Sequence, residues 1–287
     1  MNMLFQDFIG SYKPQNADEY RNALKEIVQE IALYGLSRTD FFKRAAFYGG
    51  TALRLFHGLD RFSEDMDFSL AVPEPDFELD KYCLAIRDTL LSFGLDMDVS
   101  CKEKKIDTAI QSAFIKGDTL VQLITIYNKD SNFKAIHSDE KVKIKVEIDV
   151  NPPQEATFEY KYGLRPVPYM VRLYDKPSLF AGKLHAVICR NWKNRVKGRD
   201  LYDFVWYVKN GTSINLSHLQ KRLEQTGAWK ENEELTITDL QEILCQRFAS
   251  IDYEAAKKDV RAFIKNDESL NIWSEDFFKA IASQLKG

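Results

Sequence analysis

The sequence predicts an α+β protein in which a mixed α/β part precedes an all-helical part. Hydrophobic residues alternate with charged ones from 142 to 150, the period of a strand with one buried face. After Pro177, apolar residues recur at helical spacing to the end of the chain. This change of period divides the chain near residue 175, into an α/β domain over 1–175 and a helical domain over 176–287.

Helices and strands alternate along the N-terminal part. Apolar residues at near-helical spacing predict a first helix that stops at Gly35. Pro152 and Pro153 end the alternating strand abruptly. The elements expected in this part are helices over 18–34, 51–57 and 77–93, and strands over 45–48, 66–72, 120–127, 142–150 and 169–173. In the C-terminal part we expect helices over 178–191, 199–209, 216–225, 238–248, 253–264 and 274–285.

The composition is that of a soluble globular protein, with 45% hydrophobic and 29% charged residues. No apolar run approaches the length of a membrane span, and the first residues lack the sections of a signal peptide. We therefore expect a cytoplasmic protein with no membrane partner. The net charge of −3 argues against nonspecific coating of nucleic acid but leaves room for a local basic groove.

The cysteines and histidines show no metal-ligand spacing. Four of each are scattered along the chain, so we expect free thiols and ordinary imidazoles without a zinc site or disulfides. The residues are Cys83, Cys101, Cys189, Cys245, His57, His137, His185 and His218.

A glycine turn followed by two acids is the first constellation with chemistry. Gly49 and Gly50 let backbone amides approach a phosphate, and Thr51 opens a helix whose first N–H groups point at it. Asp65 and Asp67 stand at i and i+2 of an extended segment and share a face. Carboxylates beside a phosphate site suit Mg²⁺ held partly by protein and partly by nucleotide. The set predicts metal-assisted phosphoryl or nucleotidyl transfer.

A third metal carboxylate is expected from the alternating strand. Asp149 and Glu147 share its polar face, so either acid is a candidate ligand, with Asp149 favoured. A solvated strand that pairs lysines with acids is the alternative. Ser63 is placed to cap or orient the loop before Asp65, whereas Glu64 is expected to point away from the acids.

The second constellation lies in the helical part. Lys183 and Arg190 share a helix face, and they are a point charge and a forked donor suited to a triphosphate. Lys183 has small and apolar neighbours, an unusual place for a merely solubilising charge. Asp200 and Asp203 share a face of the next helix, and Asp200 is either an N-terminal helical acid or an orienting partner for Lys183.

The segment between these helices is basic. Its cations are suited to gripping RNA phosphates, with Trp192 beside them to stack a base, although a solvated loop explains the run equally well. The candidate nucleic-acid-binding residues are Lys193, Arg195, Lys197 and Arg199.

Together these blocks make the chain resemble the AbiEii/AbiGii-type nucleotidyltransferase toxins, of the DNA polymerase β-like superfamily. The resemblance covers most of the chain from Phe47 to about Lys209. The motifs that carry it are Gly49-Gly50-Thr51-Ala-Leu, Arg61-x-Ser63-x-Asp65-x-Asp67-Phe, Lys183-Leu-x-Ala-x-x-x-Arg190 and Arg199-Asp200-x-Tyr202-Asp203. Thr51 stands where much of the superfamily has serine, which keeps the hydroxyl.

The resemblance implies a mixed sheet that carries the metal acids and a helical half that contributes to the active cleft. It implies transfer of a nucleoside monophosphate from an NTP, with one or two Mg²⁺ ions required. Many members resemble the toxin half of toxin–antitoxin or abortive-infection systems, with a cognate antitoxin, and some modify tRNA. Carried onto this chain, Asp65 and Asp67 bind metal, Gly50 and Thr51 hold the triphosphate, and Lys183 with Asp200 completes the site.

The expected mechanism is in-line displacement at the α-phosphate, with Asp149 or Asp200 as the candidate that assists deprotonation of the acceptor. Two alternatives stay open. One is a nucleotidyltransferase that modifies a small molecule such as an antibiotic. The other is a non-catalytic module that binds nucleotide or RNA.

Overall fold

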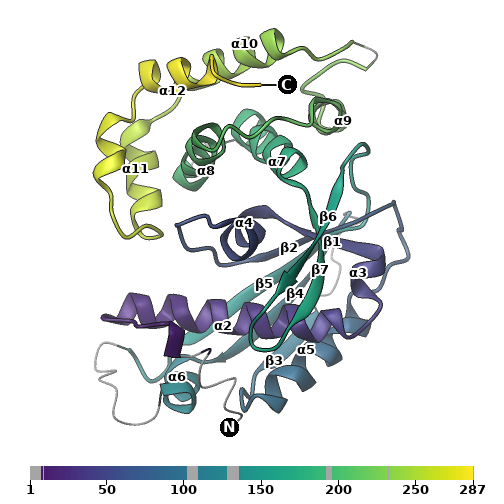
Figure 1. The fold of residues 1–287 in the computed structure, drawn as a ribbon, viewed down its shortest axis with the longest axis vertical. Helices are drawn as coiled ribbons and strands as arrows, with labels where there is room; N and C mark the ends of the chain where they lie inside the picture. Colours follow the sequence, from purple (N-terminus) through teal and green to yellow (C-terminus); the bar gives the residue numbers. More distant parts are fainter. Residues whose placement is uncertain are drawn as a thin grey trace. The chain divides into compact units, whose positions relative to one another are not determined.

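The computed structural model describes residues 8, 10–101, 109–127, 136–191, 196–231 and 233–286 (Figure 1). The chain forms two compact units. Unit 1 comprises the described residues within 1–52, 64–152 and 160–173, and unit 2 those within 53–63, 153–159 and 174–287. No helix in the described ranges is both long and apolar enough to cross a membrane.

A seven-stranded mixed sheet is built from the described strands in the order β3-β4-β5-β2-β1-β7-β6. β1 pairs with β2, and β4 with β3 and β5, in antiparallel fashion, whereas β2–β5 and β1–β7 are parallel. This architecture confirms the predicted α+β class with a mixed sheet. The strands are β1 (Ala45–Tyr48), β2 (Met66–Leu70), β3 (Asp98–Cys101), β4 (Ile110–Asp118), β5 (Lys141–Asp149), β6 (Phe158–Gly163) and β7 (Tyr169–Tyr174).

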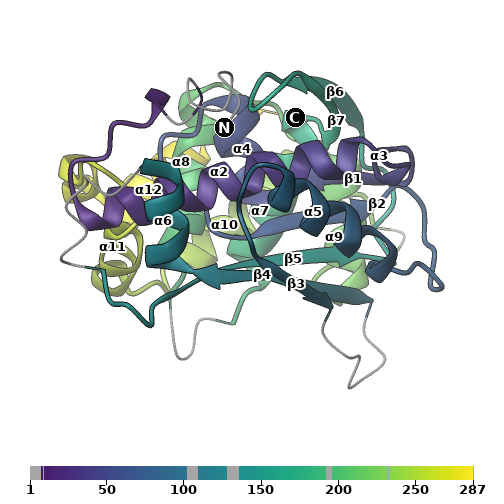
Figure 2. The same cartoon turned by 90° about the horizontal axis from the view of Figure 1, so that it is seen from below.

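The period-two pattern of β5 divides the sheet into a buried and a polar face. Val142, Ile144, Val146 and Ile148 are buried, whereas the acids and lysines between them are at least partly exposed. Each buried Val or Ile contributes about 1.5–3 kcal/mol through removal from water. Figure 2 shows α2 (Ala17–Ser37), α5 (Asp80–Ser92) and α6 (Thr119–Tyr127) gathered on one face of β3, β4 and β5. The acids and lysines of β5 lie on the opposite face.

The prediction of a strand over 120–127 was wrong, because this segment is the helix α6. Its short, β-branched apolar run fits either period, and length and packing decide between them. Leu123 and Ile126 are both buried one helical turn apart, and Gln122 Nε2 donates to the Asp96 carbonyl at 2.9 Å. Conversely β3, β4 and β6 were not located individually, since their polar residues weaken the alternation.

Two further helices belong to the start of the chain. α3 (Phe41–Arg44) leads into β1, and α4 (Gly49–His57) begins two residues earlier than expected, at the glycine pair itself. α4 starts in unit 1, and its second half is grouped with unit 2. The predicted helices and strands around the glycine turn are otherwise confirmed, with ends that differ by a few residues.

Unit 2 is helical, as predicted for this part of the chain. Its core is aromatic: Phe180 stacks on Tyr207 with ring centroids 4.4 Å apart, and Phe204, Phe248 and Phe278 are fully buried beside one another. The elements are α7 (Lys176–Cys189), α8 (Gly198–Lys209), α9 (Leu216–Gln225), α10 (Ile237–Phe248), α11 (Tyr253–Arg261), a 3₁₀ helix (Glu268–Ile272) and α12 (Glu275–Ala282).

A segment from the N-terminal half of the sequence also packs in unit 2. Within 53–63, the Phe62 N–H donates to the Phe263 carbonyl at 2.8 Å, and Asp60 accepts from the Tyr202 hydroxyl at 2.9 Å. These contacts fix the short loop that follows α4 onto helices that come much later in the chain.

Candidate active site

The glycine turn of unit 1 is shaped around Asp67. Gly49 has φ +80°, a left-handed conformation that favours glycine. A Cβ atom on Gly49 would lie 2.6 Å from Asp67 Oδ2, so a side chain there would displace the carboxylate. Asp67 lies in β2 opposite Tyr48, the last residue of β1. The glycine turn and Asp67 therefore pack directly against each other, although 18 positions separate Gly49 from Asp67.

Thr51 holds the second acid in place. Its side chain is fully buried, and its hydroxyl donates to the backbone carbonyl of Asp65. This differs from the expected contact of the hydroxyl with a triphosphate, since the proton is already used. What α4 offers to an anion is instead the backbone N–H groups of its first turn, which begins at Gly49 and Gly50 and has no intrahelical acceptors for them.

The strand register selects Glu147 as the acid nearest to Asp67. In the parallel pairing of β2 with β5, Asp67 lies opposite Glu147, whereas Asp149 lies opposite Ser69, one pair further along. Removal from water and the charges of Glu64 and Glu147 raise the pKa of Asp65. The charge of Glu147 therefore acts on Asp65, although the sequence had favoured Asp149 over Glu147 as the third acid.

Glu147 and Asp149 also differ in their contacts. Glu147 Oε1 pairs with Lys145 Nζ at 2.7 Å and accepts from the Ser112 hydroxyl at 3.2 Å. Asp149 Oδ1 accepts from the Asn151 N–H at 3.0 Å, just where the strand ends. The Asp149 contact is typical of a carboxylate that closes a strand end, whereas Glu147 faces its neighbours on the sheet.

Of the residues just before Asp65, Glu64 has contacts with the helix α2. Its carboxylate pairs with Lys25 of α2 at 2.7 Å, and its carbonyl accepts from Gln29 Nε2 at 2.9 Å. Glu64 is therefore used to tie the acid loop to the helix layer. Ser63 is partly exposed and ends the segment that is grouped with unit 2.

In unit 2, Lys183 is the centre of an ion cluster. Its Nζ atom lies 2.7 Å from Asp200 Oδ1 and 2.8 Å from Asp203 Oδ2, with 13% of the side chain exposed. Asp200 is thus the orienting partner of Lys183. Two of the three ammonium protons are engaged, which leaves at most one for a phosphate oxygen.

Arg61 and Arg190 complete this cluster. Arg61 is 3% exposed and grips Asp203 in a bidentate fashion, with Nε–Oδ1 2.5 Å and Nη2–Oδ2 2.6 Å. Arg190 Nη1 lies 2.5 Å from Asp200 Oδ2 and is about half exposed. Arg61 appeared in the sequence only as part of a motif, because its partner lies 142 residues away.

The charges of the cluster hold both carboxylates in their ionised form. Burial alone would raise the pKa of Asp200, but Lys183 and Arg190 outweigh it and hold this pKa at about 2. Burial is likewise outweighed at Asp203, whose pKa is lowered by Arg61 and Lys183. Three cations face two carboxylates, so the cluster carries one net positive charge. With such a pKa and both oxygens paired, Asp200 is unsuited to take a proton from an acceptor.

The end of α7 is fixed by a residue that sequence reasoning missed. Arg247 of α10 donates from Nε to the Val187 carbonyl at 2.9 Å and from Nη2 to the Arg190 carbonyl at 2.6 Å. Guanidinium donors at the last carbonyls of a helix satisfy groups that lack intrahelical partners. Arg247 therefore sets where Arg190 leaves the helix.

Of the predicted basic segment, only the end lies in the described residues. Lys193 and Arg195, like Trp192, lie outside them. Lys197 is the N-cap residue of α8. The guanidinium of Arg199 lies over the Phe263 ring at 4.0 Å and has its Nε 4.0 Å from Asp259 Oδ2, so it packs within unit 2.

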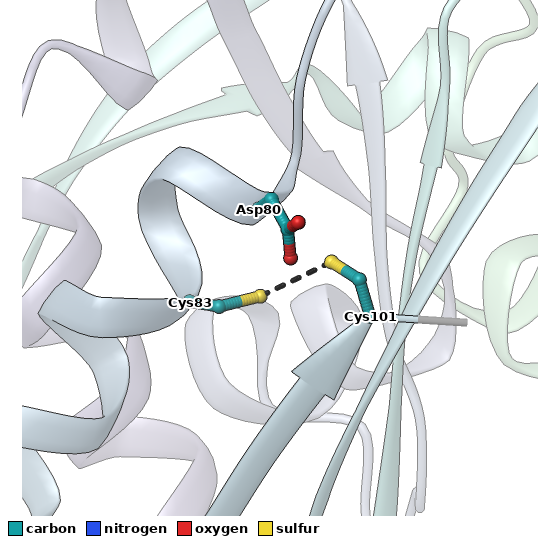
Figure 3. Close-up of side chains that lie close together, drawn as sticks. All are labelled: Asp80, Cys83 and Cys101. Atoms are coloured by element: carbon teal, nitrogen blue, oxygen red, sulfur yellow. Dashed lines mark hydrogen bonds between the residues drawn. The ribbon is translucent and has the colours of Figure 1, made fainter. Parts of the chain in front are cut away.

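The donor atoms of unit 1 have the chemistry that Mg²⁺ prefers. Carboxylates on adjacent strands supply hard oxygens, and Mg²⁺ commonly keeps several waters besides one or two protein carboxylates. Among the described residues, no three of these acids have carboxylate oxygens that all lie within 4.8 Å of one another. A tighter cluster of that kind is formed elsewhere, by Asp80, Cys83 and Cys101 (Figure 3).

Comparison with known proteins identifies the family. No curated protein matches the sequence. MenT4, a nucleotidyltransferase toxin from Mycobacterium tuberculosis, is 16% identical with a TM-score of 0.53 over 98% of this chain and 99% of that one, which shows a shared fold. JHP933 from Helicobacter pylori is 18% identical with a TM-score of 0.47, over 91% of this chain and 86% of that one. The family described as nucleotidyl transferase AbiEii toxin of type IV toxin–antitoxin systems matches residues 31–282, and the chain therefore belongs to this family of nucleotidyltransferases.

Proposed function

We propose that this nucleotidyltransferase moves a nucleoside monophosphate from an NTP to an RNA acceptor such as tRNA, with one or two Mg²⁺ ions, as the toxin of a toxin–antitoxin pair. The observation that carries the proposal is the acid face of unit 1, where Asp67 packs on the Gly49 turn and Glu147 lies opposite it. Membership of a toxin family supports a cognate antitoxin and a site of action in the cytoplasm.

The residues of unit 1 have distinct parts in this mechanism. Asp65, Asp67 and Glu147 would hold the metal, with Asp149 as the alternative third acid. The first N–H groups of α4 hold phosphate oxygens, since a helix N-terminus favours anions. When bound, Mg²⁺ supplies charge neutralisation of the triphosphate and activation of the acceptor hydroxyl. Thr51 acts by keeping Asp65 in position.

Unit 2 carries cations of a kind suited to bind phosphate groups. Lys183 offers its remaining N–H to a phosphate oxygen, and Arg190, about half exposed, adds a second positive group. Asp200 orients both and is not the base. A net positive cluster stabilises the negative charge that develops on the leaving pyrophosphate.

A small-molecule acceptor is the second candidate, and the packing of Arg199 favours it. A guanidinium that lies on Phe263 is not presented as part of an RNA-binding surface. If the acceptor is small, replacing Lys193, Arg195 and Lys197 by Gln leaves transfer unchanged. If the acceptor is RNA, the same change weakens binding, and more strongly as salt rises.

The decisive experiment incubates the protein with each α-labelled NTP, Mg²⁺ and either total RNA or a set of small-molecule acceptors. The proposal expects label in RNA with the wild type, none with Asp65→Ala/Asp67→Ala, and full labelling with Asp88→Ala, an exposed acid of α5. Label only in small molecules would replace RNA by the second candidate. Label that persists in the double variant would refute the role of the acid pair, and no transfer to any acceptor would favour a non-catalytic binding module.

A further inference from the structure

Two cysteines and an aspartate of unit 1 converge at a point apart from the acid face. Asp80 is the first residue of α5, Cys83 lies one turn further along the same helix, and Cys101 is the last residue of β3. Their ligand atoms all lie within 4.8 Å of one another, and the two sulfur atoms are 3.3 Å apart (Figure 3). None of the three belongs to the candidate active site.

We infer that Asp80, Cys83 and Cys101 form a binding site for a thiophilic divalent cation such as Zn²⁺. Thiolate and carboxylate ligands are the donors that Zn²⁺ accepts, whereas Mg²⁺ takes oxygen ligands. The site is therefore chemically distinct from the proposed Mg²⁺ site, and it stands independently of the proposed function.

The geometry fits a four-coordinate ion. Two sulfurs bound to Zn²⁺ at about 2.3 Å in a tetrahedral site lie about 3.8 Å apart. The observed 3.3 Å needs a shift of only a few tenths of an ångström at each sulfur. Cys83 is buried, Cys101 is half-buried and Asp80 is exposed, so the described residues supply three ligands, two of them at least partly shielded from solvent.

Binding of a divalent ion by the two cysteines would replace their thiol protons, so metal binding is expected to release protons. The bound ion joins the first turn of α5 to the edge strand β3, two elements that otherwise meet through side-chain packing.

The test uses the full-length protein in a phosphine reductant, with Co²⁺ as a spectroscopic probe and Zn²⁺ as competitor. We expect one equivalent of Co²⁺ to give thiolate-to-metal charge-transfer and tetrahedral d–d absorption, and Zn²⁺ to displace it. Cys83→Ser and Cys101→Ser should each weaken binding by more than about 100-fold, and Asp80→Asn by about 10–100-fold, given that loss of an outer-shell partner alone commonly costs 10–100-fold.

The matched control is Cys189→Ser/Cys245→Ser, which leaves Cys83 and Cys101 as the only cysteines and should bind Co²⁺ like the wild type. Because Asp80 is exposed, Asp80→Asn keeps the test informative if a cysteine variant fails to fold. Absence of thiolate–cobalt absorption, or its persistence in Cys101→Ser, would overturn the inference. So would isolation of the protein without zinc and with Cys83 and Cys101 joined as a disulfide, seen as a mass lower by two hydrogens.

Discussion

At the scale of single residues, the contacts of Asp200 decide what it can do. One carboxylate oxygen meets Lys183 and the other meets Arg190, in a side chain that is only 3% exposed. A carboxylate used in this way fixes the positions of two cations but has no unpaired oxygen to act as a base. The residue that sequence reasoning offered as a base is better explained as a positioning group.

Asp200→Asn should therefore abolish function through geometry. An amide removes the negative partner of two cations, and breaking a buried ion pair costs about 3–5 kcal/mol of unfolding free energy. We expect NMP transfer to fall by at least about 100-fold, a loss typical of a missing electrostatic group. Urea unfolding and transfer assays measure the two effects, with Asp88→Asn as an exposed control that changes neither. A variant that keeps full activity would contradict the orienting role.

Asp200 also makes the free energy of unfolding depend on pH in the acid range. The folded pKa of Asp200 is about 2 against an ordinary value of 3.8, so the group stabilises the fold above pH 4 and loses this contribution as pH falls toward 2. The contribution is about 2 kcal/mol. Urea unfolding of the wild type between pH 5 and 2 should show this loss, and Asp200→Asn should lack that part of the pH dependence. Parallel curves for the two proteins would contradict it.

At the scale of elements, the pairing of β2 with β5 determines which acids meet. Period two places Glu147 and Asp149 on the same face, and no property of a single strand chooses between them. The parallel register does so, because it sets Glu147 opposite Asp67 and Asp149 opposite Ser69. Sequence reasoning identified the strand and its polar face but had no access to this register.

Glu147→Gln should accordingly weaken Mg²⁺ dependence more than Asp149→Asn does. Loss of a metal carboxylate raises the Mg²⁺ concentration needed for half-maximal transfer, by at least about tenfold. The neighbouring Asp149→Asn serves as the matched control, with a change of less than about threefold, since Asp149 closes the strand end. A Mg²⁺ titration of transfer for both variants measures the difference, and the reverse order would return the third ligand to Asp149.

Helix packing in unit 2 depends on a second glycine contact. A Cβ atom on Gly198, at the start of α8, would lie 1.9 Å from the Ala256 carbonyl oxygen of α11. Gly198→Ala must separate the two helices and should cost about 1–3 kcal/mol or more. The control is Gly182→Ala in α7, whose added methyl meets Arg222 at 3.7 Å and should be neutral or stabilise by up to about 1 kcal/mol. Thermal unfolding of both variants distinguishes them, and equal melting temperatures would contradict the contact.

At the scale of the whole molecule, the chain leaves unit 1 after the glycine turn and returns at the acids. The intervening segment packs in unit 2, where Arg61 holds Asp203. The donor turn and the acid loop are therefore linked through a stretch whose fold depends on helices much later in the sequence. A single division of the sequence near residue 175 would assign residues 53–63 to the first domain, whereas they pack in unit 2.

Arg61 and Asp203 should consequently be strongly coupled. Asp203→Asn leaves the buried Arg61 without its carboxylate, and Arg61→Met leaves the buried Asp203 with Lys183 as a remaining cation, so each should destabilise by up to about 3–5 kcal/mol. The double variant should be less destabilised than the sum, with a coupling free energy of about 1–3 kcal/mol. Chemical denaturation of the four proteins completes the cycle, and additive losses would show that the contact does not form in solution.

The sequence by itself determined the elements and the chemistry carried within them. The alternation of β5 and the helix that begins at the glycine turn are local patterns, and both were predicted correctly because neighbours along the chain produce them. The spacing of Asp65 and Asp67 is also local, and their part in catalysis stays a prediction. Only the tertiary structure decided the partners: Glu147 beside Asp67, Arg61 on Asp203, and Cys83 beside Cys101. These contacts depend on strand register and packing between distant segments, which residue spacing does not encode.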